Sequence, residues 1–343
     1  MTTIRDVAQR AGFSVTQVSR ALNNYDDVSE ATRLRVQEAA RALDYHPNAA
    51  ARSLQGSHAN TIGLVIPLIL HRSYDAFWME FISGVAATCA LKGKDLLLSM
   101  AETSEEADRG LQRLVRGRRV DGIVICDIRQ VDPRIAYLRE IGLPFVAFGR
   151  TAGAQNYPFV DVNGAAGMVQ AVEHLAHLGH RRIAYLGLDS DFGFSHFRFD
   201  GYREALRRAG LDDEPALVYH DLTDEGVAPA VATLLAQPDP PTAIVAAADF
   251  LALATLGAVR AAGLRVPEDL SLVVFDDNPL VRHAVPPLTA ISQPHRCLGE
   301  EVTTLLLDRV ANAEIPVMQQ LIVPTLNVRE STAPPPGVRA GRT

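Results

Sequence analysis

The sequence predicts a small all-α head followed by an α/β part made of two doubly wound lobes. The chain has 343 residues, a length that suits two or three domains. The first 46 residues have the periodicity of three short helices. From Thr61 onward, apolar runs of strand length alternate with stretches of helix length, as in buried parallel sheets covered by helices. About eight such units favour two lobes over one.

Apolar residues make up 48% of the chain and charged residues 21%, as in ordinary globular proteins. No run of about 18 apolar residues is present, so we expect no membrane span. The N-terminus lacks the apolar core of a signal peptide, and we therefore expect a cytoplasmic protein. Cys89, Cys126 and Cys297 are far apart and lack metal-ligand spacing, which favours buried, reduced thiols.

The net charge of −7 is shared unevenly along the chain. Residues 1–58 contain seven Arg and six Asp or Glu, whereas the remainder carries 26 basic and 34 acidic side chains. A near-neutral head on an acidic body favours contact with DNA through the head alone.

The head begins with apolar residues spaced i, i+3, i+4 and i+7 from Ile4 to Ala11, which predict one helix face. Gly12 ends this helix. Ser14 is a suitable N-cap for a second helix over Val15–Leu22. A loop over 23–27 and a cap at Ser29 precede a third helix over Glu30–Leu43, which His46-Pro47 ends.

Two helices joined by a glycine-containing turn form a helix-turn-helix pattern, whose second helix is short enough to lie in a major groove. Packing of Val18, Ala21 and Leu22 would leave the other side chains outside. Arg20 can bond two acceptors of a guanine, and Thr16 and Val15 offer a hydroxyl and methyl groups to base edges. A three-helix cap with a solvated polar face is the alternative. The outward-facing set is Val15, Thr16, Gln17, Ser19 and Arg20.

The segment 48–57 is long enough for a short helix only, which would be mostly unfolded in water by itself. Gly56 and Ser57 then give a flexible exit. Strand-like runs follow it, and helix-like stretches include Phe77–Lys92, Ala166–Leu178 and Phe250–Ala262. The strand-like runs begin at Ile62, Asp95, Gly122, Phe145, Ile183, Ala243 and Leu270.

Several short motifs stand out along the chain. In the head they are Thr3-Ile-Arg-Asp-Val-Ala8, Val18-Ser-Arg-Ala-Leu-Asn23, Leu43-Asp-Tyr-His-Pro-Asn48 and Ala51-Arg-Ser-Leu54. In the body they include Val120-Asp-Gly-Ile123, Leu178-Gly-His180, Val266-Pro-Glu-Asp-Leu-Ser-Leu272 and Gln293-Pro294. In these motifs, and through about residue 330, the chain resembles the lac repressor family, also called the LacI/GalR family. Phe13 and Gln17 depart from the usual Val and Thr, and neither change affects the expected fold.

The resemblance implies a DNA-binding repressor with a two-lobed sensor similar to periplasmic sugar-binding proteins. The head would span 1–46, the hinge helix and linker 47–58, and the sensor 59–330. One lobe would comprise about 59–160 plus 292–325, and the other about 161–291. We expect the tail 331–343 to be disordered, because it has no apolar pattern.

In this family the helix-turn-helix and the hinge both contact DNA. Val15, Thr16 and Arg20 would read bases, and Leu54 would wedge into the minor groove and kink the duplex. An ordinary apolar linker residue is the alternative for Leu54. The expected DNA-contacting residues are Thr3, Ser14, Val15, Thr16, Gln17, Ser19, Arg20, Asn23, Ala51, Leu54 and Gln55.

The expected effector site lies between the lobes, where strands end. Arg198, Asp249 and Asp276 would bond a polyhydroxylated ligand, although the two carboxylates alternatively cap the following segments. Phe77 and Trp78 match positions that line the ligand pocket of relatives such as the purine repressor, with core packing as the alternative for Trp78. The expected effector-contacting residues are Phe77, Trp78, Arg150, Phe194, Arg198, Asp249 and Asp276. A sugar is favoured over a purine or another metabolite.

Two chains would pair through the sensor to bind a near-palindromic operator. A solute-binding protein and an enzyme are the alternatives from other classes; the helix-turn-helix opposes the first, and no catalytic motif supports the second.

His174, His177 and His180 have the spacing of a metal stripe, but they fall in a structural motif of the family, so we expect no metal and no cofactor. Asp132 and Asp161 are expected in loops and caps.

Overall fold

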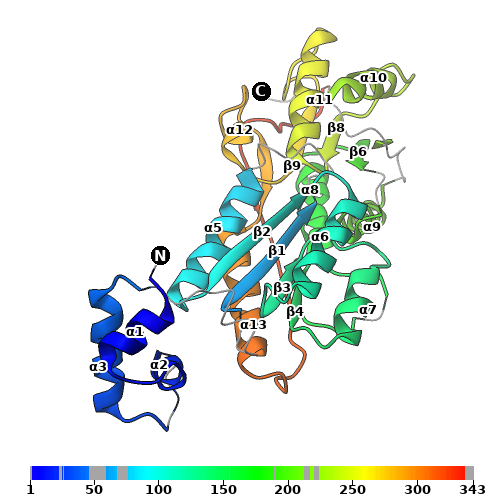
Figure 1. Cartoon of the computed structure of the whole chain (residues 1–343). Helices are drawn as coiled ribbons and strands as arrows, with labels where there is room; N and C mark the ends of the chain where they lie inside the picture. Colours follow the sequence, from blue (N-terminus) through cyan, green and yellow to red (C-terminus); the bar gives the residue numbers. More distant parts are fainter. Residues whose placement is uncertain are drawn as a thin grey trace. The chain divides into compact units, whose positions relative to one another are not determined.

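The computed structural model describes residues 2–22, 25, 27–45, 59–67, 76–153, 155–188, 191–211, 217–219 and 224–336. The chain divides into two compact units, Met1–Ala59 and Asn60–Thr343 (Figure 1). The first is all-α, and the second contains two sheets with helices on both faces. The predicted fold class, a helical head with a two-lobed α/β sensor, is therefore confirmed.

The head consists of α1 (Ile4–Ala11), α2 (Val15–Leu22) and α3 (Glu30–Ala42). Gly12 ends α1 with a φ of 74°, a left-handed conformation that suits glycine. Ser29 caps α3 by accepting a hydrogen bond from the backbone N–H of Thr32. The three helices share one small core, made of Val7, Ala8, Ala11, Val18, Ala21, Val36, Ala39 and Ala40.

The first lobe is built on a fully parallel sheet in the order β11-β5-β4-β3-β1-β2. Its strands are β1 (Thr61–Pro67), β2 (Asp95–Ala101), β3 (Gly122–Ile125), β4 (Phe145–Phe148), β5 (Phe159–Val162) and β11 (Gln319–Ile322). Helices α5 (Ala76–Leu91) and α13 (His295–Ala311) contribute to the core on one face, and α6 (Ser104–Arg116) and α7 (Pro133–Glu140) to that on the other.

Helices α5 and α13 pack side by side, although more than 200 residues separate them (Figure 1). Two glycines allow this close approach. A Cβ at Gly84 would lie 2.1 Å from the carbonyl oxygen of Arg296, and one at Gly299 would lie 2.1 Å from that of Phe81. The start of α13 is thus fixed against the first lobe by backbone packing.

The second lobe has the sheet order β12-β10-β9-β8-β6-β7, in which only β12 is antiparallel to its neighbour. The strands are β6 (Ile183–Leu188), β7 (Leu217–Tyr219), β8 (Ala243–Ala246), β9 (Ser271–Phe275), β10 (Thr289–Ser292) and β12 (Thr325–Asn327). Helices α8 (Gly164–His177) and α9 (Gly193–Arg208) cover one face. Helices α10 (Asp224–Leu235), α11 (Asp249–Ala261) and α12 (Pro279–Arg282) cover the other.

The chain crosses between the two sheets three times: after β5, after β10 and between β11 and β12. The last crossing returns the C-terminal segment to the second lobe. Expected disorder from residue 331 is therefore wrong for 331–336. Ser331 is fully buried, and its Oγ donates to the carbonyl of Leu272 and accepts from the backbone N–H of Thr289. Residues 337–343 lie outside the described residues.

The imidazole of His180 also anchors this segment. Its Nδ1 lies 2.9 Å from Thr242 Oγ1, and its Nε2 lies 2.9 Å from the carbonyl oxygen of Ala333 and 3.0 Å from Ser271 Oγ. Burial lowers the pKa of His180, which keeps the ring neutral. The segment is thus held largely by hydrogen bonds, with Pro335 also buried, and it has no apolar periodicity that would predict its placement.

The sequence also leads to expectations about the cysteines, a membrane span and a metal site. Cys89 and Cys126 are buried, as predicted, but Cys297 is exposed on α13. In the described part of the chain, no helix is long and apolar enough to cross a membrane. No cluster of three or more His, Cys, Asp or Glu side chains suited to a metal occurs among the described residues.

Candidate nucleic-acid interface and ligand cleft

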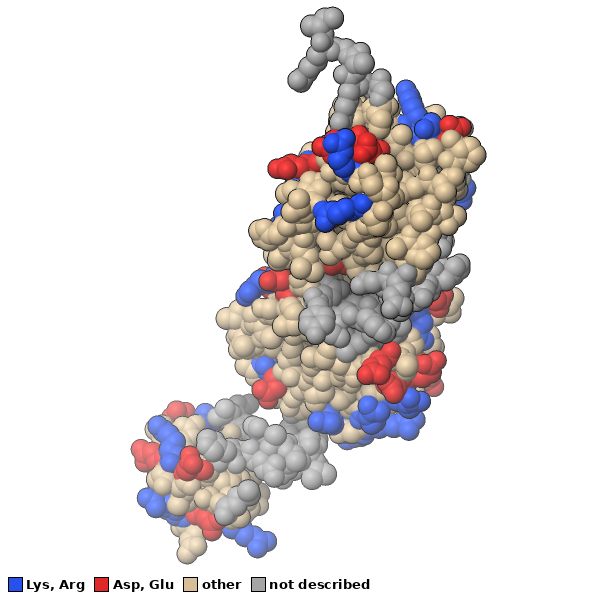
Figure 2. Space-filling view, turned by 90° about the horizontal axis from the view of Figure 1, so that it is seen from above, with Lys and Arg blue, Asp and Glu red and all other residues tan. Residues whose placement is uncertain are grey.

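The outer face of α2 is the candidate DNA-reading surface. Val15 is 41% exposed, and Ser14, Thr16 and Gln17 are exposed as well. Val18 and Ala21, on the opposite face, are fully buried in the head core. Ser19 and Arg20 are half-buried. The division into buried and outward-facing side chains of α2 is therefore as predicted. Figure 2 shows both positively and negatively charged side chains on the head.

Two of the expected DNA-contacting residues also form the N-terminal cap of α2. Ser14 Oγ accepts from the backbone N–H of Gln17 at 3.2 Å, and Gln17 Oε1 accepts from the backbone N–H of Ser14 at 3.1 Å. This reciprocal pair is a capping box. Thr3 has the same role in α1, where its backbone N–H and Oγ1 both donate to Asp6 Oδ2.

Arg20, the predicted guanine reader, has partners within the head. Its Nε donates to Asp27 Oδ1 at 3.2 Å, and its Nη2 donates to Asp27 Oδ2. Its Cζ also lies 4.7 Å from the centroid of the Tyr25 ring. One edge of the guanidinium, formed by Nε and Nη2, is therefore occupied by a carboxylate. Four expected DNA contacts lie outside the described residues: Asn23, Ala51, Leu54 and Gln55.

Arg198 of α9 lies where β8 and β9 end, at the boundary between the lobes that is the expected effector cleft. Its Nη1 donates to the carbonyl oxygen of Ala247 at 2.6 Å and lies 3.9 Å from Asp276 Oδ2. The guanidinium carbon lies 3.7 Å from the ring centroid of Phe275 and 5.1 Å from that of Phe194. Arg198 and Asp276 are thus brought together, as the sequence predicted.

Asp276 follows β9 with a φ of 84°, a conformation that is uncommon outside glycine and frequent at binding sites. Its Oδ1 accepts a hydrogen bond from Gln293 Nε2 and lies 3.9 Å from His295 Nε2. The next residue, Asp277, is bonded by Arg282, Asn327 and Arg329. Burial opposes its ionisation, but these bonds outweigh burial and hold its pKa below the usual value. Asp277 therefore anchors the turn that presents Asp276.

Asp249 is engaged with protein groups instead. Its Oδ1 accepts from the backbone N–H of Phe250 at 2.8 Å, and its Oδ2 accepts from Asn278 Nδ2. The Asn278 side chain in turn caps α12. Asp249 is the first residue of α11 and bonds an N–H of its first turn, whereas the N-cap is Ala248, so the alternative prediction that Asp249 is a cap is not borne out.

An aromatic cluster on α5 and β4 faces the same cleft from the first lobe. The Phe77 ring stacks on Phe81 and Phe148, with centroid separations of 5.9 and 5.7 Å. Trp78 is only 4% exposed and belongs to the core of this lobe, as its alternative interpretation holds. Phe77 is half-buried, and its ring centroid lies 4.8 Å from that of His295.

The sequence analysis missed His295, which begins α13. Its side chain is 9% exposed, and it touches Phe77 of the first lobe and Asp276 of the second. A series of contacts therefore runs from Phe77 through His295 and Asp276 to Arg198, across the cleft. No local signal marks His295, because Phe77 lies more than 200 residues away in the sequence.

Arg150 joins the two lobes beside this cleft. Its Cζ lies 4.0 Å from the ring centroid of Phe197 on α9, and its Nε lies 3.3 Å from Asp161 Oδ2 on β5. Burial raises the pKa of Asp161 to about 6, while the charge of Arg150 opposes that rise. Asp161 was expected in a loop or cap, but it is a buried strand residue, whereas Asp132 caps α7 as predicted.

The lobes are also joined by a backbone clip between residues 128–130 and 191–193. The N–H of Gly193 donates to the carbonyl of Ile128, and the N–H of Gln130 to that of Asp191, each at 2.8 Å. A Cβ at Gly193 would lie 2.1 Å from the carbonyl oxygen of Arg150. Only glycine permits this approach without movement of the backbone.

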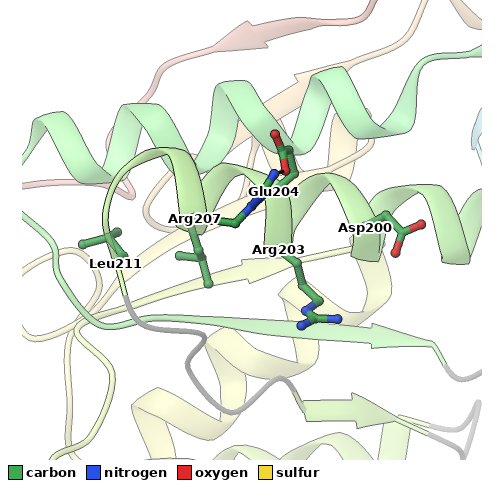
Figure 3. A pocket seen from close by; sticks show the side chains of 6 residues that line it. Asp200, Arg203, Glu204, Arg207 and Leu211 are labelled. Atoms are coloured by element: carbon green, nitrogen blue, oxygen red, sulfur yellow. Dashed lines mark ion pairs between the residues drawn. The ribbon is translucent and has the colours of Figure 1, made fainter.

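A separate pocket of about 460 Å³ lies on α9 and contains none of the expected effector residues (Figure 3). Ion pairs from Glu204 to Arg207 and to Arg208 neutralise its charges locally. No aromatic residue is among those that line it. The pocket is lined by Asp200, Arg203, Glu204, Leu206, Arg207 and Leu211.

Known protein families match both the head and the sensor of the chain. Residues 3–48 match the family described as "Bacterial regulatory proteins, lacI family". Residues 172–332 match the "Periplasmic binding protein-like domain". The HTH-type transcriptional regulator CelR of Thermobifida fusca is 36% identical over 334 residues, which cover 96% of this chain and 98% of CelR.

Solved structures agree with these matches. A "transcriptional regulator CelR-cellobiose complex" superposes with a TM-score of 0.74 at 34% identity, covering 96% of this chain and 100% of that one. A lac repressor dimer bound to operator and the anti-inducer ONPF gives a TM-score of 0.84 at 28% identity, covering 97% and 99%.

Proposed function

Because this chain belongs to the lacI family of bacterial regulatory proteins, it is a helix-turn-helix transcriptional regulator, and we propose that a sugar bound between its lobes controls its affinity for DNA. Its relatives are transcriptional regulators, and the chain is not an enzyme. We expect it to act in the cytoplasm, where bacterial DNA lies, and to repress the genes next to its operator.

The observation that carries the sugar proposal is the series of contacts from Phe77 through His295 and Asp276 to Arg198. An aromatic edge on one lobe meets a carboxylate and a guanidinium on the other. Aromatic faces suit the C–H face of a sugar ring, and charged groups bond its hydroxyls strongly. The cellobiose complex of CelR, a relative over nearly the whole chain, supports the same ligand class.

On DNA, α2 would lie in the major groove with Val15, Thr16 and Arg20 toward the bases. The hinge residues, Leu54 among them, would contact the minor groove. One head supplies one reading helix, so we propose a homodimer on a near-palindromic operator, as in the lac repressor dimer bound to its operator. Ligand binding would change the angle between the lobes, and a coupling of about 1–3 kcal/mol changes DNA affinity by about 5- to 150-fold.

The ligand class is tested by thermal unfolding of the full chain with cellobiose, maltose, glucose, adenosine and hypoxanthine, each in separate samples. We expect a sugar to raise the unfolding midpoint, because a ligand that binds only the folded state stabilises it. Asp276→Asn should abolish that rise. Asp308→Asn makes the same change at an exposed position of α13 and should leave it intact.

A purine is the second candidate, because an aromatic ring such as Phe77 also stacks on a base. A rise with adenosine or hypoxanthine, and none with the sugars, would favour it. No rise with any of the five ligands would count against both candidates.

A further inference from the structure

We infer that His295 is a specificity-determining effector contact, and that its Nε2 and Asp276 Oδ1 together select a ligand hydroxyl. This inference rests on the proposed effector site between the lobes and adds a residue and a selection rule to it.

The first observation is a buried polar atom without a partner. His295 Nε2 is inaccessible to solvent and has no hydrogen-bond partner among the described residues. Buried polar atoms are nearly always bonded, because leaving one unsatisfied is costly. His180, the other deeply buried histidine that the structure describes in full, has partners for both ring nitrogens. The nitrogen of His295 therefore lacks a partner in this arrangement of the lobes, and a ligand atom that enters between the lobes when they separate would supply one.

The second observation is the geometry of the pair. Nε2 lies 3.9 Å from Asp276 Oδ1, which is too far for a direct hydrogen bond. One oxygen atom can lie about 2.8 Å from both atoms at this separation. The two groups are thus spaced to share a single ligand atom.

The protonation state of His295 then determines which kind of ligand atom can bond both Nε2 and Asp276 Oδ1. Burial lowers the pKa of His295, although the carboxylates of Asp276, Glu80 and Asp277 oppose that shift; Arg282 lowers the pKa further. The ring is therefore neutral near pH 7. The Asp276 carboxylate favours the tautomer with its proton on the facing nitrogen, Nε2. Nε2 donates, and Oδ1 accepts.

A hydroxyl satisfies both partners, since its proton bonds Asp276 while its oxygen accepts from His295. The oxygen of a carbonyl has no proton to donate to Asp276, and the nitrogen of an amide or aromatic amine can donate to Asp276 but is a poor acceptor for His295. The pair therefore selects a hydroxyl-bearing ring.

The position of His295 does not depend on a ligand. It begins α13, whose backbone packs tightly against α5 through Gly84 and Gly299. The Phe77 ring meets the imidazole at an interplanar angle of 69° and limits its rotation. The contact to Asp276 comes from the other lobe, so a bound hydroxyl would also fasten the lobes together.

The test compares the wild-type chain with His295→Phe, His295→Gln and His180→Phe. Phenylalanine keeps the ring volume and removes the polar atom, and the amide nitrogen of glutamine can take the place of Nε2. Free energies of unfolding in urea are measured without ligand, and cellobiose affinity by calorimetry. We expect His295→Phe to be at least as stable as wild type and to bind cellobiose about 10- to 100-fold more weakly. His295→Gln should keep most of the affinity.

His180→Phe is the matched control, because it removes a buried imidazole whose nitrogens are bonded, and it should destabilise the protein clearly. Unchanged cellobiose affinity in His295→Phe would overturn the inference, and so would a loss of stability as large as that of His180→Phe. If wild type does not bind cellobiose, the proposed sugar is wrong. The stability comparison still tests the role of His295. A higher unfolding free energy in His295→Phe than in wild type supports a nitrogen whose partner is a ligand, and a lower one overturns the inference.

Discussion

Arg20 and Asp27 form an ion pair within the head, with the Nε of Arg20 donating to Asp27 Oδ1 at 3.2 Å. Arg20 is the residue proposed to bond guanine, and the Nε–Nη2 edge of its guanidinium can bond DNA only if DNA replaces Asp27 there. Asp27 both orients the guanidinium and competes with the base. The exposure of the pair limits its strength, because surface ion pairs contribute little to stability.

Asp27→Asn should therefore tighten DNA binding by at most a few-fold, because an exposed ion pair contributes little free energy. The measurement is operator affinity by fluorescence anisotropy at fixed salt. Glu38→Gln removes one negative charge from the exposed side of α3 and controls for the change in net charge. Equal effects of the two variants would mean that Asp27 acts through charge alone and does not compete for Arg20.

Gly193→Ala tests the clip between the lobes. Its Cβ would meet the carbonyl oxygen of Arg150, so we expect a loss of about 1–3 kcal/mol in unfolding free energy and a weaker ligand response. Gly257→Ala is the control, because this helix glycine of α11 has open space where a Cβ would go. It should gain about 0.5–1 kcal/mol. Wild-type stability and ligand response in Gly193→Ala would show that the clip is dispensable.

Ser331→Ala tests the anchored C-terminal segment. It removes the hydroxyl that bonds Leu272 and Thr289 and should lower the unfolding free energy by about 1–3 kcal/mol. Ser83→Ala, at an exposed position of α5, should change stability little. If urea unfolding gives the same free energy for both variants, the segment does not contribute to the fold.

Asp161 makes stability depend on pH in an unusual direction. Its pKa is about 6 in the folded chain and near 3.8 when unfolded, so the folded state binds the proton more tightly. Its contribution to stability is therefore greatest at the acid end and is lost as the pH rises from about 4 through 6. Relative to Asp161→Asn, wild type should lose about 1–3 kcal/mol over that range. A stability difference that stays constant with pH would contradict the shift.

The periodic parts of the fold could be predicted from the sequence. Predicted helices at Val15–Leu22 and Phe250–Ala262 agree with α2 and α11 to within a residue, because spacing of apolar residues and caps determines them locally. Arg198 and Asp276 could be placed together because parallel strands end at one edge of a sheet.

The remaining features depend on partners far away in the sequence. Trp78 and Phe77 are adjacent and have similar residue types, yet one is core and the other faces His295. Asp249 and Asp276 both follow strands, but Asn278 engages only Asp249. The neighbouring sequence does not indicate either difference. It does not indicate the hydrogen-bonded segment after Ser331 either, since backbone and hydroxyl groups largely hold it.

The central claim, sequence-specific DNA binding through α2, is tested most directly by selecting bound duplexes from a random library. The selection uses the full-length chain and Arg20→Ala, each with and without the five candidate ligands. We expect a near-palindromic site for wild type and, for Arg20→Ala, a loss of about 1–3 kcal/mol with relaxed preference at one base pair in each half. No enriched site under any condition, or an unchanged base preference in Arg20→Ala, would contradict the claim.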